Sequence, residues 1–397
     1  MHPNVPHLRF PEFHGEWCVS TIGEQFDLYS GNTPSRLNKE HFEGNVNWIT
    51  SGELKEHYIS DTKEKISEDA ATANNLKLLH PGTFVIAIYG LEADGVRGTG
   101  SITCKESTIS QACMAFTQKG DVKNEFLYSW YKKHGNIIGI KYAQGTKQQN
   151  LSYDILEKFH IAYPSQDEQD KLIKFISLLD ERIASQSKLI EDLKKLKSAI
   201  IDYAINSLDT DFAKFGSLYE MAGEGGTPTT SNASFYDNGN IPFIKIDDLK
   251  QKYLTENKDF ITELGLQKSS AWLVPTHSIL FSNGATIGEI SITTYPVCTK
   301  QGILGIVPKQ NIDVEFLYYF MSSSYFKKAV RRIVTEGTMK TAYLKDINNI
   351  FCPIPTKEKQ QEIAKMPSTL NSKIDFEQSI LKLFCSQKQY LLRQMFI

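Results

Sequence analysis

The segment from Gln144 to Asn150 carries side chains that suit the edges of nucleic-acid bases. It reads Gln-Gly-Thr-Lys-Gln-Gln-Asn, so seven residues offer one cation and four side-chain amides. Asn and Gln amides can form paired hydrogen bonds with adenine, and Lys or Arg with guanine. The Gly-Thr pair is small enough to let the backbone approach a ligand closely. The sequence therefore predicts a loop that contacts nucleic acid.

Other segments share this mixture of small, amide and cationic residues, among them Ser30–Arg36 and Gly95–Gly100. The basic run Tyr325–Arg332 has a helix-like pattern and suits phosphate contacts, which set register without reading sequence. Each segment taken singly is also compatible with an ordinary solvated turn or a charged helix face. The candidate DNA-contacting residues are Asn32, Thr33, Ser35, Arg36, Arg97, Gln144, Gly145, Thr146, Lys147, Gln148, Thr227, Lys245, Asn283, Lys300, Gln301, Lys327, Arg331, Thr338 and Lys340.

Catalytic and metal-binding motifs are not found in the sequence. There is no GxxxxGK[ST] phosphate loop and no GxGxxG after a strand. Asn240–Phe243 partly resembles the Asn-Pro-Pro-Tyr/Phe loop of amino-methyltransferases, but it lacks the first proline and a glycine-rich cofactor loop. His2, His7 and His14 lack metal-ligand spacing. We therefore expect no catalytic residues, no cofactor and no metal in this chain.

Composition limits the kinds of protein that fit. The 397 residues include 44 Lys and Arg against 46 Asp and Glu, a net charge of −2, which excludes binding to nucleic acid through gross positive charge. The longest apolar run, roughly Phe84–Leu91, is far shorter than the ~18–20 residues of a membrane span. The first residues, MHPNVPHLRFPEF, resemble neither a signal peptide nor an anchor. Six scattered cysteines without a CxxC pair indicate a reduced cytoplasm. We expect a cytoplasmic protein without membrane association.

The chain repeats itself with a unit of about 190 residues. Matching segments recur in the same order, at offsets between 190 and 195 residues. The matching pairs are Gly31–Pro34 with Gly225–Pro228, Gly44–Ile49 with Gly239–Ile244, Glu125–Tyr128 with Glu315–Tyr318, Gly145-Thr146 with Gly337-Thr338, Asp154-Ile155 with Asp346-Ile347, and Pro164–Gln169 with Pro355–Gln360. Such a long unit predicts two similar globular domains rather than a solenoid.

Each copy ends in a long predicted helix. In the first copy, Ser165 and Glu168 form a predicted capping box, in which the Glu168 carboxylate reaches back to the backbone. Apolar residues then follow heptad a and d spacing in both copies. The residues expected to pair the helices are Leu179, Ile183, Ile190, Leu193, Ile200, Leu370, Ile374, Leu381, Phe384 and Leu391. The predicted boundaries are a globule over 1–160, a helix over 164–207, a globule over 208–353 and a helix over 355–397.

Twin copies tend to associate about a twofold axis, which would place the two helices antiparallel. Lys197 would then lie near Glu377, and Lys388 near Gln186. The alternative is that each helix packs only on its own globule. The second helix departs from the first because Lys359 stands where an acidic capping residue is expected, and Pro367 falls inside it. A proline within a helix costs ~3 kcal/mol, so we expect a kink or a restart at Ser368.

With these elements in place, the chain resembles the specificity subunit of a type I restriction-modification enzyme. The resemblance covers essentially the whole chain and rests on the duplicated segments above, together with Asn47–Thr50 and Ala285–Gly288. It implies an α+β (mixed α/β) fold: two similar target-recognition domains joined by two long helices that pair as an antiparallel coiled coil, in a pseudo-twofold tandem repeat. Each recognition domain would read one half of a split DNA target, and the helices would set the spacer.

The same resemblance implies partners and cofactors outside this chain. Two methyltransferase (modification) subunits would dock on the helices and supply S-adenosylmethionine-dependent adenine-N6 methylation. Two motor-nuclease (restriction) subunits would supply ATP- and Mg-dependent cleavage. The alternative within the same class is the DNA-recognition subunit of a related methylation system without restriction. An autonomous methyltransferase, a binding module for a ligand such as carbohydrate, and a purely structural scaffold are the competing classes.

Overall fold

The structure, a computed structural model, describes residues 4–93, 95–145, 149–284, 286–334 and 340–397. The chain divides into two compact units, Met1–Gln186 with Ile380–Ile397, and Ser187–Ser379. Two long helices, α5 (Gln166–Asn206) and α10 (Lys357–Met395), each contribute one part to the first unit and one part to the second. Within the described residues, no helix is long and apolar enough to cross a membrane.

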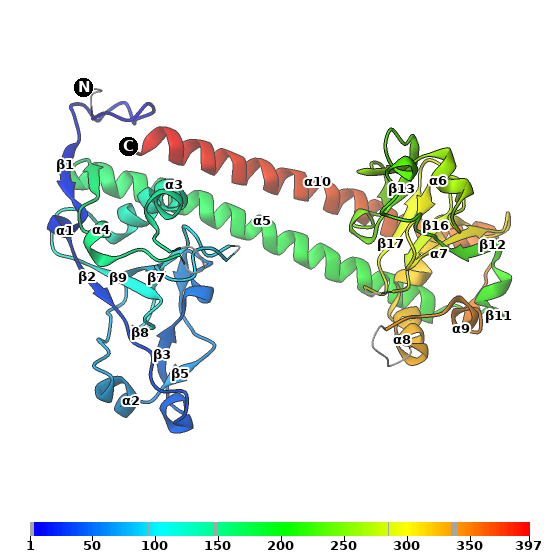
Figure 1. Ribbon diagram of the computed structural model, residues 1–397, viewed down its shortest axis with the longest axis horizontal. Coiled ribbons are helices and arrows are strands. Elements are labelled where there is room, and N and C mark those ends of the chain that lie inside the picture. Colours follow the sequence, from blue (N-terminus) through cyan, green and yellow to red (C-terminus); the bar gives the residue numbers. More distant parts are fainter. Residues whose placement is uncertain (1–3, 94, 146–148, 285, 335–339) are drawn as a thin grey trace. The chain divides into compact units, whose positions relative to one another are not determined.

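The first unit contains three small sheets. A five-stranded sheet has the order β2 (Phe26–Ser30), β9 (Cys113–Gln118), β6 (Phe84–Ala87), β7 (Gly100–Thr103), β4 (Tyr58–Ile59). A three-stranded sheet has the order β5 (Lys65–Ile66), β3 (Val46–Ile49), β8 (Ser107–Ile109). β1 (Cys18–Thr21) pairs with β10 (His160–Tyr163). The helices are α1 (Ile22–Gln25), α2 (Glu68–Ala73), α3 (Asn124–Tyr142) and α4 (Tyr153–Leu156) (Figure 1).

The second unit repeats these sheets strand for strand. Its five-stranded order is β12 (Tyr219–Glu224), β19 (Ile303–Pro308), β16 (Ile279–Ser282), β17 (Ile290–Thr293), β14 (Tyr253–Leu254). Its three-stranded order is β15 (Asp259–Ile261), β13 (Ile241–Ile244), β18 (Cys298–Thr299). β11 (Phe212–Lys214) pairs with β20 (Phe351–Pro353). The helices are α6 (Glu263–Gln267), α7 (Val314–Ser322), α8 (Ser324–Ile333) and α9 (Leu344–Ile347). The predicted α+β tandem repeat is confirmed.

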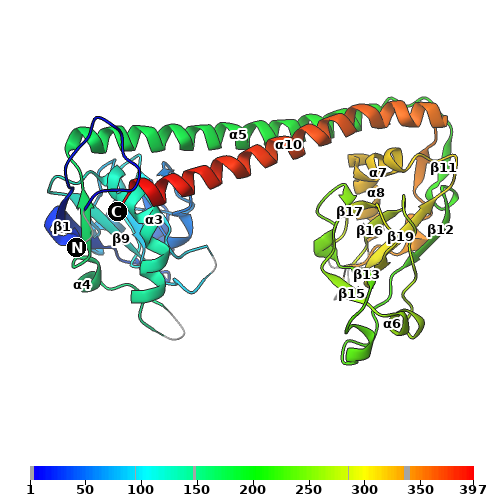
Figure 2. The ribbon, with the colours of Figure 1, turned by 90° about the horizontal axis from the view of Figure 1, so that it is seen from above.

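A helix covers one face of each five-stranded sheet. In the first unit, Phe84 of β6 packs against Tyr128 and Tyr131 of α3, with ring centroids 5.9 and 5.7 Å apart. All four residues of β6, and all four of its counterpart β16, are buried. Continuous apolar burial is what a central strand requires when both of its faces are covered. Figure 2 shows α7 and α8 between the helix pair and the strands β16, β17 and β19 of the second unit.

A buried glutamine fixes the start of each long helix. The Gln169 side chain donates to Asp121 O and Pro164 O, and it accepts from the backbone N–H of Lys123. In the second unit the Gln360 side chain makes the same three kinds of bond to the equivalent backbone. The predicted capping box is only half right. Glu168 N–H donates to Ser165 Oγ at 3.5 Å, but the Glu168 carboxylate binds Arg9, because a guanidinium offers it two charge-assisted bonds.

Of the two alternatives predicted near Pro367, a kink or a restart at Ser368, the restart is wrong. Helix α10 runs without a break from Lys357 to Met395 with Pro367 inside it. Pro367 is buried, and the Ser368 hydroxyl next to it is bonded to Tyr319 and Lys252. Packing of this turn against the unit compensates for the backbone bond that the proline cannot make. At the start of the helix, Lys359 N–H donates to Thr356 Oγ1 at 3.4 Å, so a cap forms without the acidic partner.

The α5 and α10 segments run antiparallel within each unit. In the first unit, Lys388 binds Asp180, and the Arg182 guanidinium lies 4.3 Å from the Phe384 ring centroid. In the second unit, Lys197 Nζ donates to Asn371 Oδ1 at 2.8 Å. The predicted partners of these lysines, Gln186 and Glu377, are therefore corrected to Asp180 and Asn371. Heptad spacing fixes which face of a helix is apolar, but it does not fix the axial offset between two helices.

The expected helix-pairing residues differ in exposure. Ile190, Ile374 and Leu391 are buried, whereas the remaining seven are partly exposed. The alternative, that each helix packs only on its own globule, is wrong, because each helix also contributes to the hydrophobic core of the other copy's globule near its C-terminal end. The core residues in or next to the helix ends are Leu172, Ile176, Leu392 and Phe396 in the first unit, and Ile201, Ile205 and Ala364 in the second. Each helix pair is thus anchored to its globule at the ends.

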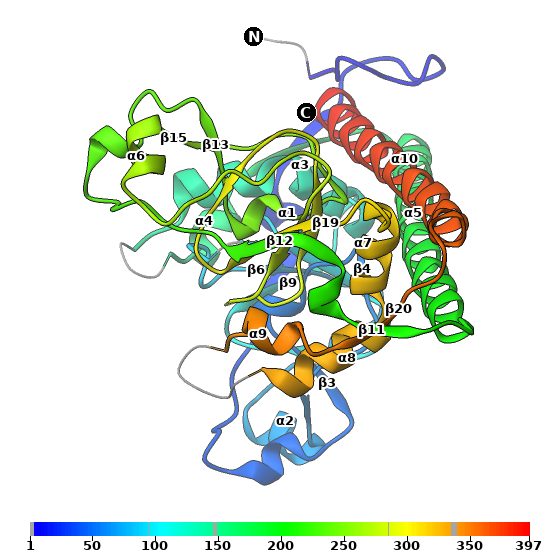
Figure 3. The same ribbon diagram turned by 90° about the vertical axis from the view of Figure 1, so that its right-hand side faces the viewer.

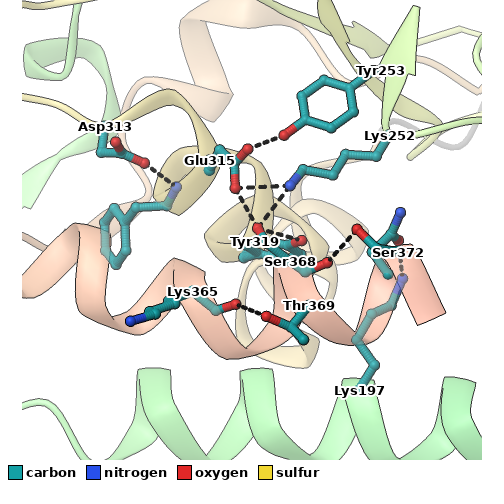
Figure 4. A network of polar contacts seen from close by, with 12 residues as sticks. Lys197, Lys252, Tyr253, Asp313, Glu315, Tyr319, Lys365, Ser368, Thr369 and Ser372 are labelled. Carbon is teal, nitrogen blue, oxygen red and sulfur yellow. Dashed lines mark hydrogen bonds and ion pairs between the residues drawn. The ribbon is translucent and has the colours of Figure 1, made fainter. Parts of the chain in front are cut away.

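A buried polar cluster ties the helix pair of the second unit to its sheet (Figure 4). Lys252, which precedes β14, places Nζ 2.8 Å from Glu315 of α7 and 2.9 Å from Ser368 of α10. Tyr319 donates to Ser368 at 3.1 Å, and Tyr253 bonds the Glu315 carboxylate. Burial lowers the pKa of Lys252, while Glu315 works in the opposite direction. Figure 3 shows α7 beside the helix pair that this cluster joins.

The first unit carries the same cluster with histidine in place of lysine. His57 precedes β4, and its ring is stacked between Tyr58 and Tyr128 at 4.1 and 3.9 Å. Its Nε2 lies 2.8 Å from Glu125 of α3, and its Nδ1 lies 3.4 Å from Asp180 of α5. Burial lowers the pKa of His57, but hydrogen bonds and ionic attraction from Asp180 and Glu125 outweigh burial, so the pKa is raised above its ordinary value.

We predict that this histidine makes the stability of the first unit fall as pH rises. A group whose pKa is higher in the folded protein stabilises it fully below the unfolded pKa of ~6.5, and this contribution is lost as pH rises through the folded pKa. His57→Lys copies the second unit and keeps its charge at higher pH. Urea unfolding between pH 6 and 9 should show a declining free energy for the native chain and a flatter profile for the variant. Equal slopes for both chains would contradict the prediction.

Candidate nucleic-acid interface

Several predicted loops of the first unit leave the same end of the five-stranded sheet. Strands β2 and β6 end at Ser30 and Ala87, beside the first residues of β9, and β7 begins there at Gly100. The segment before α4 joins them, because Leu91 N–H donates to Gln149 O at 3.1 Å. The described parts of the predicted loops, residues 31–36, 95–100, 144–145 and 149–150, therefore cluster at this end, as the strand connections require.

Arg97 and Gln144 lie in this cluster, although Arg97 is partly enclosed. The Arg97 guanidinium donates to Gln149 Oε1 at 2.7 Å, and its side chain packs on Gly139 of α3, where a Cβ would come within 2.5 Å of it. Gln144 is exposed, and its backbone pairs with Asn150. Gly145 is exposed with φ of 109°, a backbone conformation that favours glycine. Thr146, Lys147 and Gln148 lie outside the described residues.

The remaining first-unit candidates lie next to the three-stranded sheet. Asn32 is exposed and its side chain donates to Asn74 O, while Thr33 is partly exposed and Ser35 is exposed. Arg36 forms a double hydrogen bond with Glu64, both contacts at 2.8 Å, and lies over the Phe42 and Trp48 rings. The guanidinium lowers the pKa of Glu64, so the pair stays charged at neutral pH. A base or phosphate would have to compete with Glu64 for Arg36.

The second unit gathers its candidates at the equivalent end of its sheet. Gln301 N–H donates to Thr227 Oγ1 at 3.3 Å, and Lys300 N–H donates to Ile244 O at 2.9 Å, next to Lys245. The Lys245 ammonium lies 2.8 Å from Asp259. Lys245, Lys300 and Gln301 are exposed, and Thr227 is partly exposed. Two lysines and an amide thus share one solvent-facing loop cluster.

Asn283 has a different role from the one predicted. It is 1% exposed, and its side chain donates to Ala342 O at 3.3 Å, while its backbone O accepts from Ala342 N–H. In this conformation its amide cannot reach a base edge. Instead it holds the segment that begins at Lys340. Residues 335–339, which include the candidate Thr338, lie outside the described residues. This burial was not predictable from residue type, since Asn is normally a surface residue.

Three cations of the second unit line one cavity. Lys327 and Arg331 project from α8, and Lys340 approaches from the following segment, around a cavity of about 520 Å³. All three are exposed. The spacing of Lys327 and Arg331, four residues apart on a helix, places them on one face. Glu289 and several apolar side chains, Phe281 and Ile287 among them, line the same cavity. The three cations therefore suit contacts with a phosphate backbone without making the whole cavity an anion site.

Leu37, an exposed residue of the first unit, was not among the candidates predicted from the sequence. Leu37 is 98% exposed in the loop that carries Ser35 and Arg36. A single exposed apolar side chain is ordinary on a protein surface, so only its place next to Arg36 makes Leu37 a candidate contact. Nothing in the sequence distinguishes Leu37 from a core leucine, because its exposure depends on the tertiary course of the loop.

Comparison with known proteins decides the family. The family model of the type I restriction modification DNA specificity domain matches twice, over residues 14–195 and 209–383. The chain belongs to this family of specificity subunits. It is 24% identical over 385 residues to the MjaIX specificity subunit of Methanocaldococcus jannaschii, covering 90% of this chain and 88% of that protein. Over 115 residues, 29% of this chain and 25% of that protein, it is 35% identical to the HindI specificity subunit of Haemophilus influenzae.

Solved structures show the same fold. The specificity subunit from M. genitalium matches with a TM-score of 0.57 and 18% identity, over 99% of both chains. A chain from a study of assembly and conformational transition of the type I restriction-modification system matches with a TM-score of 0.61 and 14% identity, over 95% of this chain and 96% of that one. The predicted family and two-domain fold are confirmed, and the relatives named above are specificity subunits. The predicted DNA-contacting residues and domain boundaries stay predictions.

We predict that Lys300 contributes to DNA affinity and that Lys309 does not. These exposed lysines flank the same strand, β19, at opposite ends, so each is a matched control for the other. Lys300→Ala should weaken binding of the chain to duplex DNA and reduce the slope of log K against log salt by about one. Fluorescence anisotropy across a salt series measures both quantities. An equal loss from Lys309→Ala would place the DNA elsewhere.

Proposed function

We propose that each unit of this chain reads one half of a split target in double-stranded DNA. The observation that carries this proposal is the duplicated sheet, which presents amide and cationic loops at the same end in both units. The loops differ in sequence between the units, with Gln144 and Arg97 in one and Lys300, Gln301 and Lys245 in the other. Two related but unequal surfaces suit two different half-sites, since side-chain identity determines which base edges are bound.

Affinity for DNA should come from local patches, because the whole chain has a net charge of −2. Several cations at the loops are already paired with carboxylates, as Arg36 is with Glu64 and Lys245 with Asp259. We therefore propose that the isolated chain binds DNA weakly and that partner subunits supply much of the phosphate neutralisation. The separation of the half-sites is set by the length of the helices α5 and α10, which contain 41 and 39 residues.

The helices offer a second apolar stripe to partner subunits. Besides the residues that face the neighbouring helix, large apolar side chains are exposed at seven-residue intervals. They are Leu383 and Tyr390 in the first unit, and Leu189, Leu196 and Tyr203 in the second. Exposed apolar rows on helices favour docking of another helix. We propose that two methyltransferase subunits bind here and that two motor-nuclease subunits complete the assembly.

We propose that methylation and DNA cleavage are catalysed by those partner subunits and not by this chain. The methyltransferase subunits would bind S-adenosylmethionine and methylate adenine N6, and the motor-nuclease subunits would use ATP and Mg. Among the described residues, no group of His, Cys, Asp and Glu is arranged to hold a metal ion. This chain would contribute the position at which methylation occurs.

The direct test is a genome-wide map of N6-methyladenine. Cells expressing this chain with its methyltransferase partner should show a new split motif with a fixed gap, compared with cells lacking only this chain. Replacing residues 1–150 with the same segment of a relative should change one half of the motif and leave the other half and the gap. Absence of new methylation, in a complex shown to be assembled and to bind its cofactor, would contradict the proposal.

A further inference from the structure

In the first unit, the segment over residues 4–15 covers the start of α5 and the end of α10. Leu8 N–H donates to Gln394 O at 3.0 Å. Arg9 binds the Glu168 carboxylate through two bonds of 2.8 and 2.7 Å, and Glu12 binds Lys171. We call this covering segment the leader.

Aromatic packing also holds the leader on the surface formed by Glu168, Lys171 and Phe175 of α5, which we call the seat. Phe10 packs edge-on against Phe175 of α5, with ring centroids 5.7 Å apart, and the Lys171 ammonium lies 4.6 Å from the Phe10 centroid. As a result Phe175 is only partly exposed. Charge pairs and an aromatic contact together hold a segment that has no helix or strand of its own.

The equivalent seat in the second unit is an open groove. In that unit the chain enters β11 directly from α5, through residues 207–211, so no leader is present. A cavity of about 590 Å³ lies there, lined among others by Tyr203, Leu208, Lys359, Glu362 and Met366. Met366, the equivalent of Phe175, is 57% exposed, and Tyr203 is 77% exposed. The groove therefore exposes the apolar surface that the leader covers in the other copy.

The groove is also lined by Asp209, but at the two equivalent helix positions its charges are opposite to those of the seat. Lys359 stands in place of Glu168, and Glu362 stands in place of Lys171. Lys359 and Glu362 form an exposed ion pair with each other at 2.9 Å. Such an exposed pair contributes little to stability, so exchanging it for contacts with a ligand costs little.

We propose that the groove binds an irregular peptide segment of a partner protein, with the charge order of the leader reversed. The segment carries an acidic residue opposite Lys359, an aromatic residue next to it over Met366, and a basic residue three positions after the acid, opposite Glu362. A leader from a second copy of this chain is disfavoured, because Arg9 would face Lys359 and Glu12 would face Glu362. The juxtaposition of like charges lowers affinity for the wrong partner.

The test uses two labelled peptides and the full chain. Both peptides span residues 4–15; one has the native sequence, and the other carries Arg9→Glu and Glu12→Lys. Fluorescence anisotropy should show saturable binding of the charge-reversed peptide, at least five-fold tighter than that of the native one. Peptide in solution competes poorly for the leader's own seat, because the tethered leader is present there at a high effective concentration.

A double variant provides the decisive control. Lys359→Glu with Glu362→Lys keeps an ion pair at the same spacing, so circular dichroism should show an unchanged fold. It should invert the preference, so that the native peptide binds more tightly than the reversed one. Saturable binding with inverted preference supports the proposal. Lack of binding by both peptides, or the same preference on both forms of the chain, overturns it. Because no DNA is involved, this failure would leave the proposed half-site reading intact.

Discussion

A basic side chain held between a sheet, a covering helix and the long helices is the contact on which each unit depends. In the second unit Lys252 joins Glu315 and Ser368, and in the first unit His57 joins Glu125 and Asp180. Removing one member of such a group leaves a buried charge without its partner, which costs far more than losing an exposed pair. The cluster therefore fixes how the loops at the end of the sheet relate to the helices within that unit.

The sequence repeat predicted the two globules and their long helices, but it did not predict the polar contacts that those helices make. Repeated segments at offsets of 190 to 195 residues were enough to predict two equivalent globules, each followed by a long helix, and the strand orders agree. The clustering of the loops follows from strand connection alone. By contrast, the partners of Lys197 and Lys388 depend on an axial offset that the heptad pattern does not contain. Asp180 is placed by its contact with His57, a residue 123 positions earlier in the sequence.

Candidate site residues were harder to predict than the fold. Local composition identified exposed loop residues such as Gln144 and Lys300, because turns rich in Gly, Asn and Lys normally face solvent. It failed for Asn283, whose amide is buried against a backbone carbonyl. The capping pattern likewise failed for Glu168, which binds Arg9 instead of capping its own helix. Both outcomes depend on a partner distant in sequence. The two copies also differ in ways that duplication alone does not predict, such as the leader that only the first unit has.

We propose that the length of the helix pair sets the distance between two DNA half-sites, each of which is read independently by one unit. Since Asp180 meets Lys388 within the first unit, Ser185 of α5 lies about opposite Leu383 of α10. Inserting one seven-residue heptad at both positions preserves the apolar face and adds about 10 Å of helix. Mapping N6-methyladenine with this variant in the assembled complex should show both halves of the motif unchanged and a gap longer by up to about three base pairs at ~3.4 Å each. An unchanged gap, with methylation retained, would contradict the account.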